Sequence, residues 1–349
     1  MQGSPLRIGV LHDFPHADGG AAAETALRMG LDEVRTDGRL DREVELVTEH
    51  VAGLPMGSEH DVVRGFRALD ERGCLLVVGP AISDNALITT PIGDEIGLAT
   101  INFTGGERTR GAFGFQYQVG SLEEEPAALA ERLQQRGLSR PAVVHDRSPV
   151  GKRYAECFDD AAAALRLEIT GRHAVSPLAD DVTVPLARLR DGGPDSLVYL
   201  GLGIASRAVA LGLASVGWSI PVVANSALMF GYARPEWRDG WAGWEYLDAI
   251  ADDNERRQAI AALDEALAAS PVTCAMVDMG RLVGEALARA DHLTRDGMRE
   301  SFERIKRLPA SCGYQGTTMG FGVYDHGALS HGFLVLREWK DGKSVQVAI

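Results

Sequence analysis

The stretch from Leu75 to Gly106 constrains the fold more than any other part of the sequence, because it holds a complete strand–helix–strand unit. Apolar residues 75–78 predict a short buried strand, which Gly79-Pro80 ends. Apolar residues 98–101 predict a second buried strand. Two strands joined by a helix indicate a parallel sheet. In such sheets, ligands lie outside the carboxyl ends of the strands.

The helix between these strands begins near Ser83, Asp84 and Asn85, three residues that can act as N-caps. A helix N-terminus presents unpaired N–H groups that can bind a carboxylate or a carbonyl oxygen. Simple capping of the helix is the alternative interpretation. Asp84 already supplies a negative charge to the helix dipole and therefore disfavours an anionic ligand.

These residues carry a family resemblance. Gly79-Pro80, Ser83, Pro91 and the Thr104-Gly105-Gly106 loop resemble the type I periplasmic binding proteins, the bilobal receptors of the branched-chain amino-acid transport family. The ending of the chain is similar too, with an aromatic-Asp-x-Gly turn at 324–327 before a strand and a terminal hairpin. The resemblance runs from about residue 7 to 347 and implies that Ser83 contacts the ligand.

The predicted fold class is α/β, with two doubly wound parallel-sheet lobes joined by three hinge crossings. A chain of 349 residues exceeds one comfortable core, which favours two domains. We expect lobe I to comprise residues 1–117 and 248–325, and lobe II residues 118–247 and 326–349. The three crossings between the lobes are expected in the extended segment 115–119, at residues 245–247 and at residues 324–327.

The remaining pattern predicts alternating strands and helices up to residue 225. Three further helices, predicted at 254–269, 274–290 and 295–305, have no strands between them and must cover the sheet of lobe I. A terminal hairpin is predicted to turn at Asp341-Gly342. The acidic run Glu123–Glu125 is interpreted as favourable charge at a helix N-terminus and nothing more.

Charge and targeting signals limit the partners and the compartment. The net charge of −14 argues against nucleic acid and anionic membranes as partners. Residues 197–233 contain one charged residue, Arg207, but their glycines and Pro221 indicate buried strands and a helix rather than membrane insertion. The sequence shows no signal peptide, so we expect a cytoplasmic protein, or a periplasmic or extracellular one if a signal was removed.

Candidate ligand contacts follow from the strand-end loops and from the resemblance. In amino-acid-binding members, loops of the second lobe supply a tyrosine, a polar side chain and an acid for the ligand's ammonium group. This sequence places Val150, Gly203 and Ser226 there, so an ammonium group would lack a buried counter-ion. The sequence thus predicts a largely apolar pocket. The candidate ligand-binding residues are His12, Asp13, Phe14, Ser83, Asp84, Asn85, Phe103, Thr104, Val150, Gly203, Ser226, Phe230 and Val272. For Phe230 and its neighbour Met229, simple packing of their loop is the alternative interpretation.

No catalytic residue, cofactor or metal is predicted. The sequence has no GxSxG elbow, no phosphate loop and no HExxH. A metal site at His12, Asp13, His16 and Asp18 is a weaker alternative, because no carboxylate cage accompanies them. We therefore expect a non-enzymatic receptor for an apolar or aromatic metabolite. Its partner would be an ABC permease or a cytosolic regulatory protein; the alternatives are an amino-acid receptor and an enzyme on a similar bilobal fold.

Overall fold

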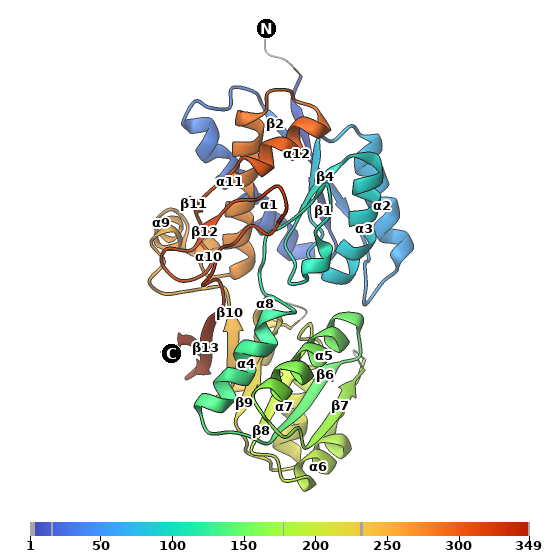
Figure 1. Cartoon of the computed structure of the whole chain (residues 1–349), viewed down its shortest axis with the longest axis vertical. Coiled ribbons are helices and arrows are strands. Elements are labelled where there is room, and N and C mark those ends of the chain that lie inside the picture. The colour runs from blue at the N-terminus through green and yellow to red at the C-terminus, as the bar shows by residue number, and fades with distance from the viewer. Residues whose placement is uncertain (1–3, 15–16, 177, 231–232, 348–349) are drawn as a thin grey trace. The chain divides into compact units, whose positions relative to one another are not determined.

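The computed structural model describes residues 4–14, 17–176, 178–230 and 233–347. The chain forms two compact units, one of Met1–Val119 with Ile250–Phe333 and one of Gly120–Ala249 with Leu334–Ile349. The chain therefore passes between the units three times (Figure 1). None of the helices in the described ranges is long and apolar enough to cross a bilayer.

Unit 1 is built on a five-stranded sheet in which all neighbouring strands are parallel, in the order β2-β1-β3-β4-β5. Its strands are β1 (Leu6–His12), β2 (Val44–His50), β3 (Leu76–Val78), β4 (Ala99–Asn102) and β5 (Gly114–Gln116). The segment expected only to cross between lobes is thus partly a strand, because Gly114–Gln116 pairs with β4.

Helices cover both faces of the unit 1 sheet (Figure 1). On one face lie α2 (Glu59–Glu71) and α3 (Ser83–Ile96), and Phe66 of α2 is fully buried among Leu11 of β1 and Val77 of β3. On the other lie α1 (Ala17–Thr36), α11 (Pro271–Arg289) and α12 (Arg295–Glu303). Glycines let α1 and α11 touch: a Cβ on Gly30 would lie 1.9 Å from the Val277 carbonyl oxygen.

The C-terminal helices belong to unit 1, as predicted, but their boundaries differ. The single helix expected at 254–269 is two, α9 (Glu255–Leu263) and α10 (Glu265–Ala268). The break falls at Asp264, whose side chain accepts hydrogen bonds from the Ala266 and Leu267 amides and so starts a new helix. Smaller elements complete the unit: η1 (Glu107–Thr109), β11 (Leu308–Pro309) and β12 (Thr318–Met319).

Unit 2 contains a seven-stranded sheet in the order β14-β13-β10-β9-β8-β6-β7. The strands are β6 (Pro141–Asp146), β7 (Gly171–Val175), β8 (Ser196–Leu200), β9 (Val222–Ala224), β10 (Glu245–Asp248), β13 (Val335–Lys340) and β14 (Lys343–Gln346). The five from β6 to β10 pair in parallel, whereas β13 and β14 are antiparallel. Residues 245–247, expected only as a crossing, therefore form a strand.

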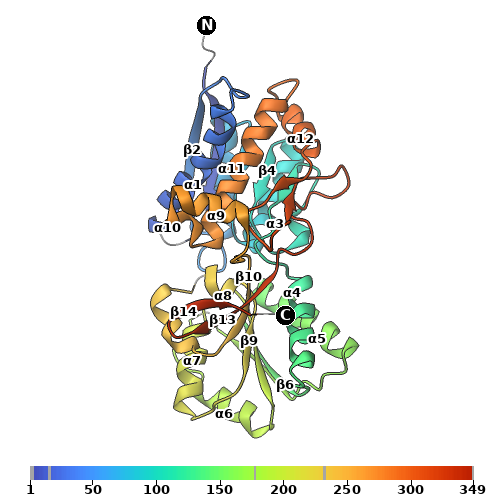
Figure 2. The same cartoon turned by 90° about the vertical axis from the view of Figure 1, so that its left-hand side faces the viewer.

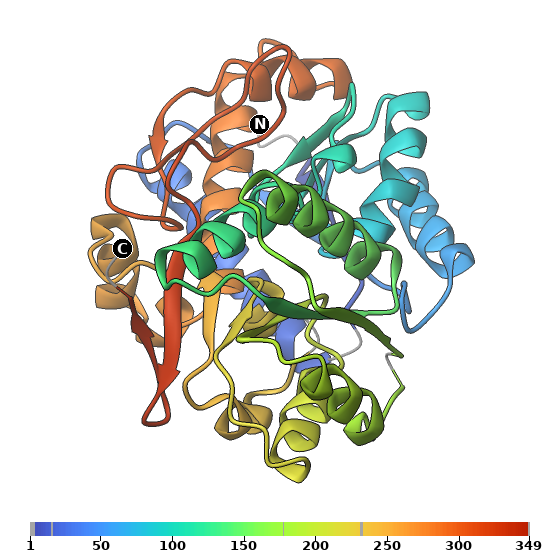
Figure 3. The same ribbon diagram turned by 60° about the horizontal axis from the view of Figure 1, so that its bottom comes forward.

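Figure 2 shows α6 (Thr183–Asp191) and α7 (Ser206–Ser215) on one side of the unit 2 sheet, with α4 (Glu124–Gln135) and α5 (Pro149–Ala164) on the other. Two short helices, α8 (Ala227–Phe230) and η2 (Pro235–Trp241), follow β9. The predicted hairpin is confirmed at the sheet edge (Figures 2 and 3). Asp341 and Gly342 both have positive φ, at 50° and 73°, as a two-residue hairpin turn requires.

The predicted α/β fold class is confirmed. The three boundaries differ from expectation, two of them by two residues and the third by more: residues 326–333, expected in lobe II, lie in unit 1. The reason is backbone pairing, since Gly327 forms a bridge with Gln116 and Leu329 with Met319. The described chain thus positions two sets of strand-end loops, one on each sheet.

Candidate functional site

In unit 1, Asp13 fastens the loop between β3 and α3. Its carboxylate, 1% exposed, accepts hydrogen bonds from the backbone amides of Ala81 (2.8 Å) and Ile82 (3.1 Å) and from Nδ2 of Asn85 (2.8 Å). Burial raises the pKa of Asp13, although these donors oppose the shift. Asp13 and Asn85 therefore hold the loop in place; Asn85 also accepts from the Leu54 amide at 2.8 Å.

The start of α3 differs from the prediction. The N-cap is Ile82, which contributes no side-chain hydrogen bond, so capping by Ser83, Asp84 or Asn85 is wrong. The physical reason is that Asp13, which follows β1, supplies the acceptor that a cap would have supplied. Ser83 is thus the first helical residue, and its backbone N–H precedes the first intrahelical bond, which the Asn85 and Ala86 amides make to Ile82.

Uncharged side chains hold the start of the loop after β4. Thr104, 1% exposed, shares hydrogen bonds of 2.9 Å with Oδ1 of Asn102 and the hydroxyl of Thr109, while its carbonyl accepts from Gln116. Gln116 lies on β5 and Thr109 in η1, so this network joins three segments. Phe103 beside it is buried as well. The polar network was missed at the sequence level, because Thr109 and Gln116 come from outside the loop.

His12, at the end of β1, lies against His50 of β2 with ring centroids 5.0 Å apart. Its Nε2 is 3.5 Å from Oε1 of Glu24, and burial lowers its pKa. Within the described ranges, no group of three or more His, Cys, Asp or Glu side chains is arranged to hold a metal ion. Phe14 is half-buried. His16 lies outside the described residues, as does the side chain of Asp18.

In unit 2, Asp146 ends β6 and fastens the loop after β8. The buried carboxylate accepts from the Tyr199 hydroxyl (2.9 Å) and the Leu202 amide (2.7 Å). Burial raises its pKa to about 6 despite these donors. The predicted contact Gly203 has a φ of +81° and packs against the α8 segment, where a Cβ would lie 2.8 Å from the Ala227 carbonyl oxygen.

A second buried carboxylate in unit 2 fastens the loop after β9. Ser226 donates both its backbone N–H (2.5 Å) and its hydroxyl (2.9 Å) to Glu125 of α4. The interpretation of Glu123–Glu125 as favourable helix charge alone is therefore wrong, because Glu125 is fully buried. A sequence signal existed: Ser121 precedes Glu125 by one helical turn, a spacing close to that of a capping box.

The other predicted contacts lie at helix N-termini. Val150 is buried in the first turn of α5, which Ser148 caps. Val272 is half-buried in the first turn of α11, which Ser270 caps. Gly231 and Tyr232 lie outside the described residues, and so does the side chain of Phe230. The structure thus groups the predicted residues as loops of unit 1 and loops of unit 2, with Val272 apart on α11.

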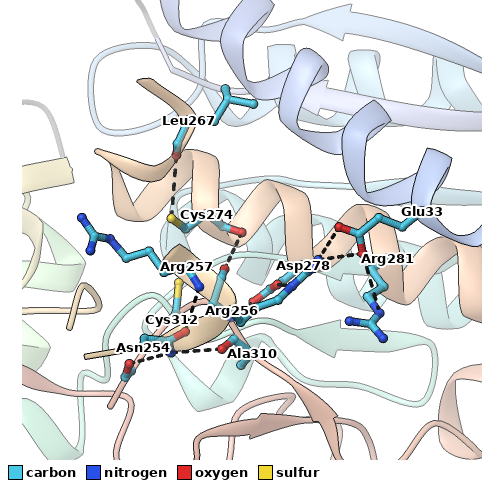
Figure 4. Close-up of polar contacts among 12 residues, drawn as sticks. Glu33, Asn254, Arg256, Arg257, Leu267, Cys274, Asp278, Arg281, Ala310 and Cys312 are labelled. Carbon is cyan, nitrogen blue, oxygen red and sulfur yellow. Dashed lines mark hydrogen bonds and ion pairs between the residues drawn. The ribbon is translucent and has the colours of Figure 1, made fainter. Parts of the chain in front are cut away.

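A cavity of about 800 Å³ lies elsewhere in unit 1, among α1, α9 and α11. Four arginines and three acids line it, and ion pairs form among them, as between Arg39 and Asp37 and between Arg256 and Glu33. Glu33 accepts from Arg256 at 2.6 and 2.7 Å and lies 3.9 Å from Arg281 (Figure 4). Asn254 caps α9 nearby and donates to the Ala310 carbonyl. None of the predicted ligand contacts lines this cavity.

Solved structures of other proteins are similar to this structure along almost the whole chain. Over 98–99% of both chains, the structure is similar to the leucine-binding protein LivK of Thermotoga maritima (15% identity, TM-score 0.80) and to the substrate-binding protein LivJ of Streptococcus pneumoniae in complex with isoleucine (14%, 0.83). An ABC transporter substrate-binding protein from Desulfitobacterium hafniense in complex with leucine is also similar (18%, 0.82, covering 99% of this chain and 100% of that one).

No curated protein sequence matches the chain. A family model does match it, over residues 5–343, and confirms the resemblance suggested by Gly79-Pro80 and Ser83. On that match across nearly its whole length, the chain belongs to the periplasmic binding protein family, whose members are ligand-binding receptors.

Proposed function

We propose that this protein is a non-enzymatic receptor that binds a small, largely apolar or aromatic metabolite at the strand-end loops of its two units. The ligand class rests on one observation: three buried acids at these loops are already engaged within their own units. Asp13, Asp146 and Glu125 each accept hydrogen bonds from groups of their own unit. A ligand ammonium group would have to break one of these sets to pair with any of the three acids, which is costly.

The polar contact in this proposal is the first turn of α3. Because Asp13 replaces the missing cap, the Ser83 hydroxyl is free of capping, and the Ser83 amide comes before the first helical bond. Such amides favour an oxygen acceptor. A carbonyl or hydroxyl oxygen suits the site, because Asp84 already places negative charge in the same turn.

Binding is proposed to act by closure of the two units. The chain passes between the units three times, so their relative motion would be limited to opening and closing. A ligand that touches both sets of loops favours the closed state through its additional contacts there. Phe103 and Val150 are apolar candidates for those contacts, one from each unit.

The partner follows from the compartment. In an exported form, the protein would deliver its ligand to an ABC permease; a form retained in the cytoplasm would report ligand to a regulatory protein. Fractionation of native cells distinguishes the two roles, because a transport receptor is recovered outside the cytoplasm.

A second candidate is a receptor for branched-chain amino acids, favoured by the similar structures that hold leucine and isoleucine. A thermal-shift screen with leucine, isoleucine, valine, aromatic acids and amides separates the two. A ligand present at 100 times its dissociation constant adds about 2.7 kcal/mol of stability. Stabilisation by aromatic acids or amides supports the apolar receptor, whereas stabilisation by branched-chain amino acids alone overturns it.

A further inference from the structure

Glu125 lies in the first turn of α4 and is one of the most completely partnered acids in unit 2. Its carboxylate accepts four hydrogen bonds: from the Ser121 amide (2.7 Å), the Tyr154 hydroxyl (2.8 Å), and the amide (2.5 Å) and hydroxyl (2.9 Å) of Ser226. Three of the four donors converge on Oε1, and the Ser226 amide alone reaches Oε2. The side chain therefore connects three separate segments of unit 2.

Helix capping explains only one of these contacts. Ser121 forms a cap of its own, since its hydroxyl accepts from the Glu124 amide and its N–H donates to Glu125. The two Ser226 bonds span 101 residues of sequence and reach the loop after β9. A cap alone would not require them. The segment they hold includes Ser226 and α8, which the proposed function assigns to the ligand loops.

The packing leaves no spare room around the carboxylate. A Cβ on Gly120 would lie 2.4 Å from Oε1 of Glu125 and 2.3 Å from the Ser226 hydroxyl oxygen, so glycine is required there. Gly120 is also the first residue of unit 2 after the first passage from unit 1. Glu125 thus fixes the loop after β9 to the point where the chain begins unit 2.

The surroundings of Glu125 are uncharged. Within the described residues it forms no ion pair, and the titratable group in contact with it is Tyr154 of α5. Ser121 from its own helix start and Ser226 from the β9 loop contribute neutral donors. Burial outweighs the donors and raises the pKa of Glu125 to about 7.

We propose that Glu125 is the positioning residue of the ligand loop that follows β9, and that this fastening loosens as the carboxyl group loses its proton. Opening of the loop lets water reach the carboxylate, so a buried charge favours the open form. The fastening itself is independent of any ligand. Its link to ligand binding rests on the proposed function.

Hydrogen exchange of the full-length protein tests this directly. Protection of residues 226–230, corrected for intrinsic rates, is measured at pH 5.5 and pH 8 in the wild type and in Glu125→Gln, Glu125→Ala and Glu124→Gln. The wild type should lose protection by about tenfold or more at the higher pH. Glu125→Gln, a mimic of the protonated acid, should show no such change, and Glu125→Ala should exchange fast at both values.

Glu124→Gln is the matched control, because Glu124 is the exposed neighbour in the same helical turn. It should behave as the wild type. Tyr154→Phe removes one donor and keeps the acid, and it should raise exchange several-fold even if Glu125→Ala does not fold. Unchanged protection in both Glu125→Ala and Tyr154→Phe overturns the positioning role. A wild-type pH response that persists in Glu125→Gln overturns the role of the proton. Neither outcome depends on finding a ligand, so failure here is distinct from failure of the proposed function.

Discussion

In both units, a buried aspartate at the end of the first strand holds the loop after the neighbouring strand. The units differ at the next loop along the sheet, which neutral side chains hold in unit 1 and a carboxylate holds in unit 2. Asp13 directly follows β1 and accepts backbone N–H groups from the loop after its neighbour β3. Asp146 ends β6 and accepts the Leu202 amide from the loop after its neighbour β8. The sheet orders β2-β1-β3-β4-β5 and β7-β6-β8-β9-β10 match element by element. In both units, a buried acid at the carboxyl end of the second strand in this order therefore holds the loop after the third.

The difference lies in the loops after β4 and β9. In unit 1, Thr104 and its neutral partners Asn102 and Thr109 hold the start of the loop. In unit 2, the carboxylate of Glu125 does so. A neutral network is insensitive to pH, whereas a buried acid with a raised pKa titrates near neutrality. The loop after β9 should thus respond to pH through Glu125, whereas the Thr104 network after β4 should not.

The largest loss of stability is expected for a substitution whose new side chain collides with the backbone. Gly79 follows β3 with a φ of +103°, and a Cβ there would lie 2.4 Å from the Leu11 carbonyl oxygen. Gly79→Ala should cost about 5 kcal/mol, the sum of backbone strain and a clash with rigid main chain. Urea denaturation measures it. The equivalent Gly201→Ala meets the Asp146 side chain instead and should cost less; equal losses would contradict the comparison.

The second largest loss of stability is expected when the buried acid that both units share is removed. Asp13→Ala leaves the amides of Ala81 and Ile82 and the side chain of Asn85 without their acceptor, which should lower the free energy of unfolding by about 4 kcal/mol. Asp41→Ala is the control at an exposed acid. A loss under about 1 kcal/mol in denaturant titrations would mean that the loop keeps its shape without Asp13.

Most of the fold could be predicted from the sequence, because apolar runs and helix periodicity are local signals. The unit at 75–101 needed only its own residues. The strands β5 and β10 were interpreted as crossings because each is three or four residues long and takes its identity from pairing with a neighbouring strand. Their partners are not visible in a local pattern.

The site was predictable only in outline. The strand-end loops and the start of α3 at Ser83 follow from the alternation of strands and helices. The inward orientation of the Asp13 and Glu125 side chains does not follow from this alternation, because their hydrogen-bond partners lie 68 and 101 residues away in sequence. Acids that look like solvent-exposed charge or ligand contacts in the sequence turn inward because the neighbouring loops present amides that need an acceptor.

Asp146 should make the stability of the protein depend on pH. Its pKa rises from 3.8 to about 6 on folding, so the folded state binds the extra proton and stability falls as pH rises through that window. The loss should be about 3 kcal/mol at most. Asp146→Asn should flatten the slope between pH 4 and 6 in a series of urea titrations, although it is less stable overall because an amide group faces the Leu202 N–H. An unchanged slope would show that another group titrates there.

The smallest loss of stability is expected for a substitution in the neutral network of unit 1. This prediction tests directly whether the loops of the two units differ in their response to pH. Thr104→Val removes the hydroxyl that joins Asn102 to Thr109 while keeping the shape of the side chain. The cost should be about 1 kcal/mol, that of a buried hydrogen bond between neutral groups. It should be the same at pH 5 and pH 8 in denaturant titrations, since neither partner titrates. Ser226→Ala, which removes the equivalent hydroxyl beside Glu125, should instead show a cost that differs between the two pH values, because the acceptor changes its charge. If the costs of the two substitutions change with pH in the same way, the proposed difference between a neutral network and a titrating acid is wrong.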